Sequence, residues 1–101
     1  MPTLADALAA VDAARDEIIS LTQALVQVPS INTGVMPTGD ETPAAELLRS
    51  VYEREGIASE VVESAPNRGN VVARIPGDGS ALSLMLMGHL DVVPVEDPDQ
   101  W

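Results

Sequence analysis

Residues 81–87 read Ala-Leu-Ser-Leu-Met-Leu-Met, and this stretch decides the fold class. Side chains alternate between the two faces of a strand, so Leu82, Leu84 and Leu86 would lie on one face and the two methionines on the other. A strand that is apolar on both faces is typical of a sheet that is covered on both sides. The pattern therefore predicts a central strand in an α/β protein.

Two more strands are predicted before this one, over residues 58–63 and 70–75, where the apolar residues follow a period of two. The connections between the three strands, residues 64–69 and 76–80, are short and rich in turn-forming residues. A parallel crossover needs about a dozen residues or more, so consecutive strands are expected to pair in antiparallel fashion.

A long helix is predicted over residues 4–28. Thr3 and Asp6 have the spacing of an N-terminal capping box, and Ile18, Leu21 and Leu25 recur at helical intervals. Pro29 is expected to end the helix, because the residue before a proline is disfavoured in the helical region. Residues 30–41 then have the composition of an exposed loop.

A second helix is predicted to begin at Thr42, which can cap it, with Pro43 in the first turn and Gly56 as the C-terminal stop. Its inward face is expected to consist of Leu47, Leu48, Val51 and Tyr52.

The order of elements is thus two helices followed by three strands, within a chain of 101 residues. A central strand needs a neighbour on each side, and only one is available before residue 101. We therefore expect residues 1–101 to be the N-terminal part of a larger α/β domain, with the remainder of that domain absent.

Composition excludes several function classes. The formal net charge is −11 and the chain has no lysine, so a nucleic-acid or anionic membrane surface is a poor partner. There is no cysteine, so any metal would be held by His, Asp or Glu. The N-terminus lacks the basic start of a secretory signal, and the uncharged stretch 18–39 is too polar to span a bilayer. A soluble, cytoplasmic chain is expected.

The candidate chemistry lies directly after the predicted central strand, where residues 88–94 read Gly-His-Leu-Asp-Val-Val-Pro. His89, the only histidine, and Asp91 are two apart and would project from the same face. A carboxylate that accepts one imidazole N–H makes the other ring nitrogen a better metal ligand. The alternative is an ordinary packed histidine followed by a turn-forming aspartate. Arg68 and Arg74 are expected at the surface.

The apolar strand followed by residues 88–94 and then Trp101 resembles the M20 family of zinc metallohydrolases, and the resemblance extends upstream to Val28-Pro29-Ser30, Glu55-Gly56-Ile57 and residues 70–74. The family includes carboxypeptidase G2-like peptidases, aminoacylases, acetylornithine deacetylase and succinyl-diaminopimelate desuccinylase. The resemblance covers essentially the whole chain, and residues 88–94 are its specific part. It implies a three-layer α/β/α catalytic domain with a mixed sheet, and a lid or dimerisation domain beyond residue 101. A homodimer of the full-length protein is possible on the same grounds.

The resemblance also implies residue roles. His89 matches the first metal-ligating histidine, and Asp91 matches the carboxylate that orients it without binding metal. The family holds two zinc ions, with Co²⁺ or Mn²⁺ as possible substitutes, and cleaves amide bonds in small peptides or N-acyl amino acids through a metal-activated water. The general base and the other ligands would lie downstream, so the 101-residue chain alone is expected to be inactive. A competing hypothesis is a non-catalytic α/β binding or structural domain in which His89 is packed.

Overall fold

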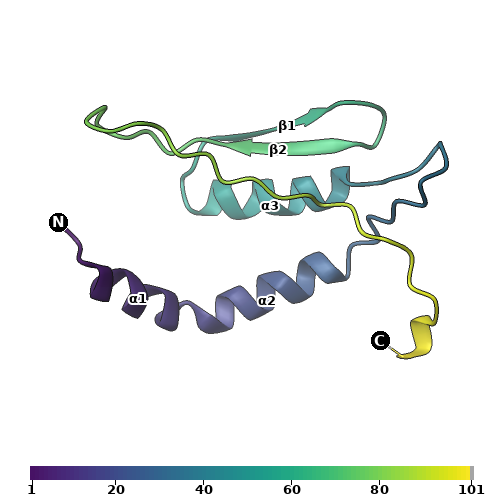
Figure 1. Cartoon of the computed structure of the whole chain (residues 1–101), viewed down its shortest axis with the longest axis horizontal. Helices are drawn as coiled ribbons and strands as arrows, with labels where there is room; N and C mark the ends of the chain where they lie inside the picture. Colours follow the sequence, from purple (N-terminus) through teal and green to yellow (C-terminus); the bar gives the residue numbers. More distant parts are fainter. Residues whose placement is uncertain (101) are drawn as a thin grey trace.

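The computed structural model describes residues 1–100 and shows a mixed helix and strand architecture (Figure 1). The α/β class predicted from the sequence is therefore confirmed. The chain begins with two helices in succession, continues through a third helix and a β-hairpin, and ends in a long irregular segment with one short 3₁₀ turn, η1 (Pro98–Gln100).

The single long N-terminal helix predicted over residues 4–28 is wrong in its continuity. The structure has α1 (Leu4–Ala13) and α2 (Arg15–Val26), separated at Ala14, whose backbone leaves the helical region at φ −86° and ψ 6°. Neither helix has a fully buried side chain, so packing against the rest of the chain does not force α1 and α2 into one continuous helix. The predicted capping box is confirmed, because Thr3 and Asp6 each accept from the other's backbone N–H.

The helix α3 (Thr42–Arg54) lies close to its predicted position. It has Pro43 in the first turn, as expected, and Gly56 follows its end at φ +70°. The predicted cap is wrong, because Glu41 is the N-cap residue and the Thr42 hydroxyl instead donates to Glu63 Oε1 at 2.7 Å. The predicted inward side chains are half-buried, whereas the residues fully buried on α3 are Ala44 and Ala45.

The hairpin consists of β1 (Ser59–Glu63) and β2 (Gly69–Ala73), paired in antiparallel fashion as predicted. Its register places Ser59 opposite Ala73 and Glu63 opposite Gly69. Both strands contact α3, so the hairpin and this helix form one packed unit.

The predicted third strand is not formed among residues 1–100. Residues 81–87 are extended but have no strand partner, and their apolar side chains are exposed, with Leu82 at 99% and Met87 at 90%. A strand requires a second backbone to take up its hydrogen bonds, and β2 pairs only with β1. Figure 1 shows the segment running back past α3 toward the end of α2. In residues 1–100 no helix has the length and apolarity that a membrane crossing would require.

Candidate metal-binding site

The segment that carries His89 and Asp91 is held by the residues that follow α2. Ile31 and Val92 form an isolated parallel bridge, in which Asn32 N–H donates to Val92 O at 2.7 Å and Val92 N–H donates to Ser30 O at 2.9 Å. The Ser30 hydroxyl, which is almost completely buried, donates to Leu90 O at 2.7 Å. Residues 30–32 thus fix the backbone of residues 90–92, about 60 positions further along the chain.

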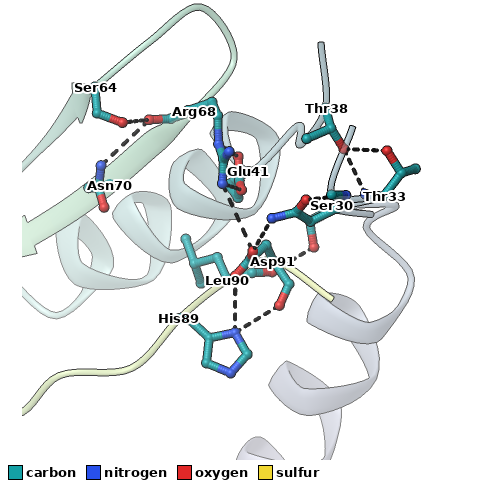
Figure 2. Close-up of polar contacts among 12 residues, drawn as sticks. Ser30, Thr33, Thr38, Glu41, Ser64, Arg68, Asn70, His89, Leu90 and Asp91 are labelled. Carbon is teal, nitrogen blue, oxygen red and sulfur yellow. Dashed lines mark hydrogen bonds and ion pairs between the residues drawn. The ribbon is translucent and has the colours of Figure 1, made fainter. Parts of the chain in front are cut away.

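His89 contacts Asp91 as the sequence predicted. Its Nδ1 lies 2.8 Å from the Asp91 carbonyl oxygen and 3.1 Å from Oδ1 of the carboxylate (Figure 2). Both partners are acceptors, so a neutral ring carries its proton on Nδ1 and keeps the Nε2 lone pair free. The side chain is 84% exposed, so this histidine is not packed in a core.

The second oxygen of the Asp91 carboxylate has partners of its own. Oδ2 accepts from the Asn32 side-chain amide at 2.8 Å and lies 3.9 Å from Nη2 of Arg68. The hydrogen bond from Asn32, together with the weaker one from His89, lowers the pKa of Asp91 against the opposing effect of partial burial. The carboxylate is therefore ionised at neutral pH.

Arg68 is not the free surface residue that the sequence suggested, although Arg74 is exposed as expected. Its guanidinium forms two bonds with the Glu41 carboxylate, of 2.7 Å and 3.2 Å, and the Glu41 side chain is only 7% exposed. Figure 2 shows this ion pair beside Asp91, with a dashed line from Arg68 to Asp91. Glu41 precedes α3 and Arg68 lies in the hairpin turn, so the pair joins both to the candidate site.

Sequence reasoning missed Ser30, Asn32 and Glu41. All three lie in residues 30–41, which were predicted to be an exposed loop. Ser30 and Asn32 bond to Leu90 and Asp91, 60 and 59 positions further along the chain. Glu41 bonds to Arg68, 27 positions further along. The one available signal is that this polar segment directly follows Pro29, where the sequence predicted the end of a helix.

A pocket of about 390 Å³ adjoins these residues. His89, Asp91 and Arg68 are among its polar lining residues, and Tyr52 and Leu86 are among its apolar ones. It offers mixed polar and apolar surface next to the imidazole.

The described residues offer His89 as a metal-ligating position but do not form a complete metal site. Within residues 1–100 no three His, Asp or Glu side chains come close enough to hold an ion together. A catalytic zinc ion usually has three protein ligands, so a complete site would need residues from outside this sequence.

Comparison with known proteins finds relatives among named enzymes. The chain is 32% identical over 103 residues to an N-formyl-4-amino-5-aminomethyl-2-methylpyrimidine deformylase of Halalkalibacterium halodurans, covering 100% of this chain and 23% of that protein. It is 36% identical over 62 residues to a probable succinyl-diaminopimelate desuccinylase of Staphylococcus aureus, covering 61% of this chain and 15% of the relative. A succinyl-diaminopimelate desuccinylase of Delftia acidovorans is 31% identical over 87 residues, or 82% of this chain and 21% of the relative.

The chain therefore spans at most 23% of the length of these curated relatives. No protein-family model matches the chain, and no solved structure shows a significant match.

Proposed function

Since the chain is related to the M20-type hydrolases, we propose that it forms the N-terminal part of the catalytic domain of a metal-dependent enzyme that hydrolyses amide bonds. The chain spans less than a quarter of its relatives, so the activity belongs to the complete protein. The 101-residue chain alone is predicted to be inactive.

One observation carries the proposal. The only histidine has Nδ1 held by Asp91 and its Nε2 free at the surface, which is the arrangement of a metal-ligating imidazole. In this proposal His89 ligates the metal through Nε2, and Asp91 orients the ring. Zinc, when bound, supplies Lewis-acid polarisation of an amide carbonyl and an activated water.

The names of the relatives support one substrate class over another. The sequence left open small peptides and N-acyl amino acids, whereas a deformylase and a desuccinylase are both named for the removal of an acyl group. We therefore propose an N-acylated small molecule as the substrate, released as an amine and a carboxylate. A cytoplasmic location and a homodimer of the complete protein stay predictions.

The proposal is tested by zinc content in the complete protein. His89→Ala is expected to remove about one zinc equivalent per chain and most of the activity, as measured by elemental analysis and by release of free amine from N-acyl substrates. Asp91→Asn is expected to keep the ligand but weaken metal affinity or rate by about 10- to 100-fold.

Asp78→Asn is the matched control, because Asp78 accepts only from Ser80 in an exposed turn. It should retain both zinc and activity. Unchanged zinc in His89→Ala would contradict the proposal and favour the non-catalytic α/β domain. Detection of cobalt or manganese in place of zinc would change the metal but not the role of His89.

A further inference from the structure

The Asp91 carboxylate divides its two oxygens between different partners. Oδ1 lies 3.1 Å from His89 Nδ1, which also contacts the Asp91 carbonyl oxygen at 2.8 Å (Figure 2). Oδ2 accepts from Asn32 Nδ2 at 2.8 Å. A carboxylate bonded only through Oδ1 can rotate about its terminal torsion and exchange the imidazole for water. The bond at Oδ2 removes that freedom, because the planar group cannot turn without breaking it.

The amide of Asn32 can present its NH₂ group to Asp91 in only one orientation. Its Oδ1 accepts from Gly34 N–H at 2.9 Å, and its own backbone N–H donates to Val92 O at 2.7 Å. The side-chain oxygen is thus committed to the turn at Gly34, which has φ +78°. The nitrogen must then face the carboxylate, so the network itself fixes the assignment of the amide atoms.

Arg68 adds a fixed positive charge on the same side. Its Nη2 lies 3.9 Å from Asp91 Oδ2, and the two bonds to the buried Glu41 hold the guanidinium in place. At 3.9 Å this contact is longer than a hydrogen bond, so Asn32 is the group that sets the direction of the carboxylate.

We propose that Asn32 is a positioning residue for His89, acting through Asp91 to hold the proton on Nδ1 and leave the Nε2 lone pair directed outward. The inference rests on the proposed function, because the orientation of His89 matters only if its imidazole ligates a metal. Its geometry and its test, however, require no metal.

The test uses the 101-residue chain at a concentration where sedimentation velocity shows it to be monomeric, and its single histidine gives one pair of ring ¹⁵N signals. Recorded at about pH 9, these shifts report the ratio of Nδ1–H to Nε2–H tautomer. The wild-type chain is expected to favour Nδ1–H. Asn32→Asp keeps the acceptor for Gly34 but replaces the donor with a carboxylate oxygen that repels Asp91. The ratio should therefore fall about five-fold, the effect of one ordinary hydrogen bond, or more.

Gln23→Glu is the matched control, because it makes the same amide-to-carboxylate change on the exposed surface of α2. It should leave the ratio at the wild-type value. Backbone signals of β1 and β2 report folding in the same sample. Should Asn32→Asp unfold, Asn32→Ser removes the amide donor with a smaller change and should show the same fall.

Two results would overturn the inference: an Nε2–H tautomer in the wild-type chain, or an unchanged ratio in a folded Asn32 variant. Either could occur while His89→Ala still loses zinc from the complete protein, in which case the proposed function survives. Conversely, a five-fold fall with no zinc loss in His89→Ala would reject the metal role and keep the positioning role of Asn32.

Discussion

The ion pair between Glu41 and Arg68 is the most buried ion pair of the described residues near the candidate site. Both oxygens of the Glu41 carboxylate are bonded to the guanidinium, and the two side chains are 7% and 27% exposed. Removing one partner of a buried ion pair is strongly destabilising, because the remaining charge is buried without a compensating partner. The pair therefore connects the start of α3 to the hairpin turn, and removing either side chain leaves the other charge without its partner.

Arg68→Gln is expected to destabilise the chain by about 3 kcal/mol, since it leaves the Glu41 carboxylate buried without a counter-ion. Urea unfolding followed by circular dichroism measures the change. Arg49→Gln serves as control, because Arg49 pairs with Glu46 and Glu53 on the exposed face of α3 and should cost about 1 kcal/mol or less. Equal losses in the two variants would contradict the special position of Arg68.

At the scale of elements, α3 and the hairpin approach each other through small residues. Ala44 and Ala45 are 2% and 0% exposed, and Gly69 at the start of β2 lies against the first residue of α3. A Cβ at Gly69 would lie 2.8 Å from Thr42 Oγ1 and 2.9 Å from its backbone Cα. Backbone cannot move aside as a flexible side chain can, so the close approach requires glycine here.

Gly69→Ala is accordingly expected to destabilise the packed unit by about 1–3 kcal/mol, the usual cost of overpacking. Gly77→Ala is the natural comparison, because a Cβ at Gly77 has nothing within 4 Å. Its stability in urea should equal that of the wild type or slightly exceed it. A neutral Gly69→Ala would show that the helix and hairpin are separated by more than the structure indicates.

The capping box of α1 predicts a pH dependence. Hydrogen bonds from the backbone and side chain of Thr3 lower the pKa of Asp6, so the ionised carboxylate stabilises the start of the helix. A lowered pKa means that this contribution is complete above the ordinary aspartate value of about 4 and is lost as the pH falls through the lower folded value.

Helicity measured by circular dichroism should therefore decrease as the pH is taken below about 4, and less so in Asp6→Asn. Thr3→Ala should reduce the helix content already at neutral pH, where the cap is worth about 1 kcal/mol. A wild-type acid titration that matches that of Asp6→Asn would show that the box is not formed.

At the scale of the whole molecule, the chain is open. Its radius of gyration is 16.4 Å, where a compact domain of this length would have about 13 Å. The exposed apolar side chains of residues 82–87 follow one another without interruption except at Ser83. Such a segment, with free backbone hydrogen-bonding groups, is a template for pairing with another strand.

The isolated chain is therefore expected to self-associate as its concentration is raised, although its net charge of −11 opposes association. Sedimentation velocity at increasing concentration measures this. Leu84→Ser with Leu86→Ser should shift the distribution toward monomer, while Leu8→Ser with Val11→Ser on exposed α1 should not. A wild-type chain that stays monomeric throughout would contradict the prediction.

Local chemistry alone determined several features of this protein. The capping box at Thr3, the stop at Gly56, the antiparallel hairpin and the contact between His89 and Asp91 each depend on residues close in sequence, and the structure contains them all.

Tertiary structure decided what connects distant positions. The pairing of residues 30–32 with 90–92, the burial of Glu41 against Arg68 and the bond from Asn32 to Asp91 join segments 27 to 62 residues apart. The apolar pattern of residues 81–87 was correctly read as apolar on both faces but did not yield a strand. The physical reason is that a side-chain pattern specifies which faces seek cover, whereas a strand exists only where a second backbone accepts its hydrogen bonds.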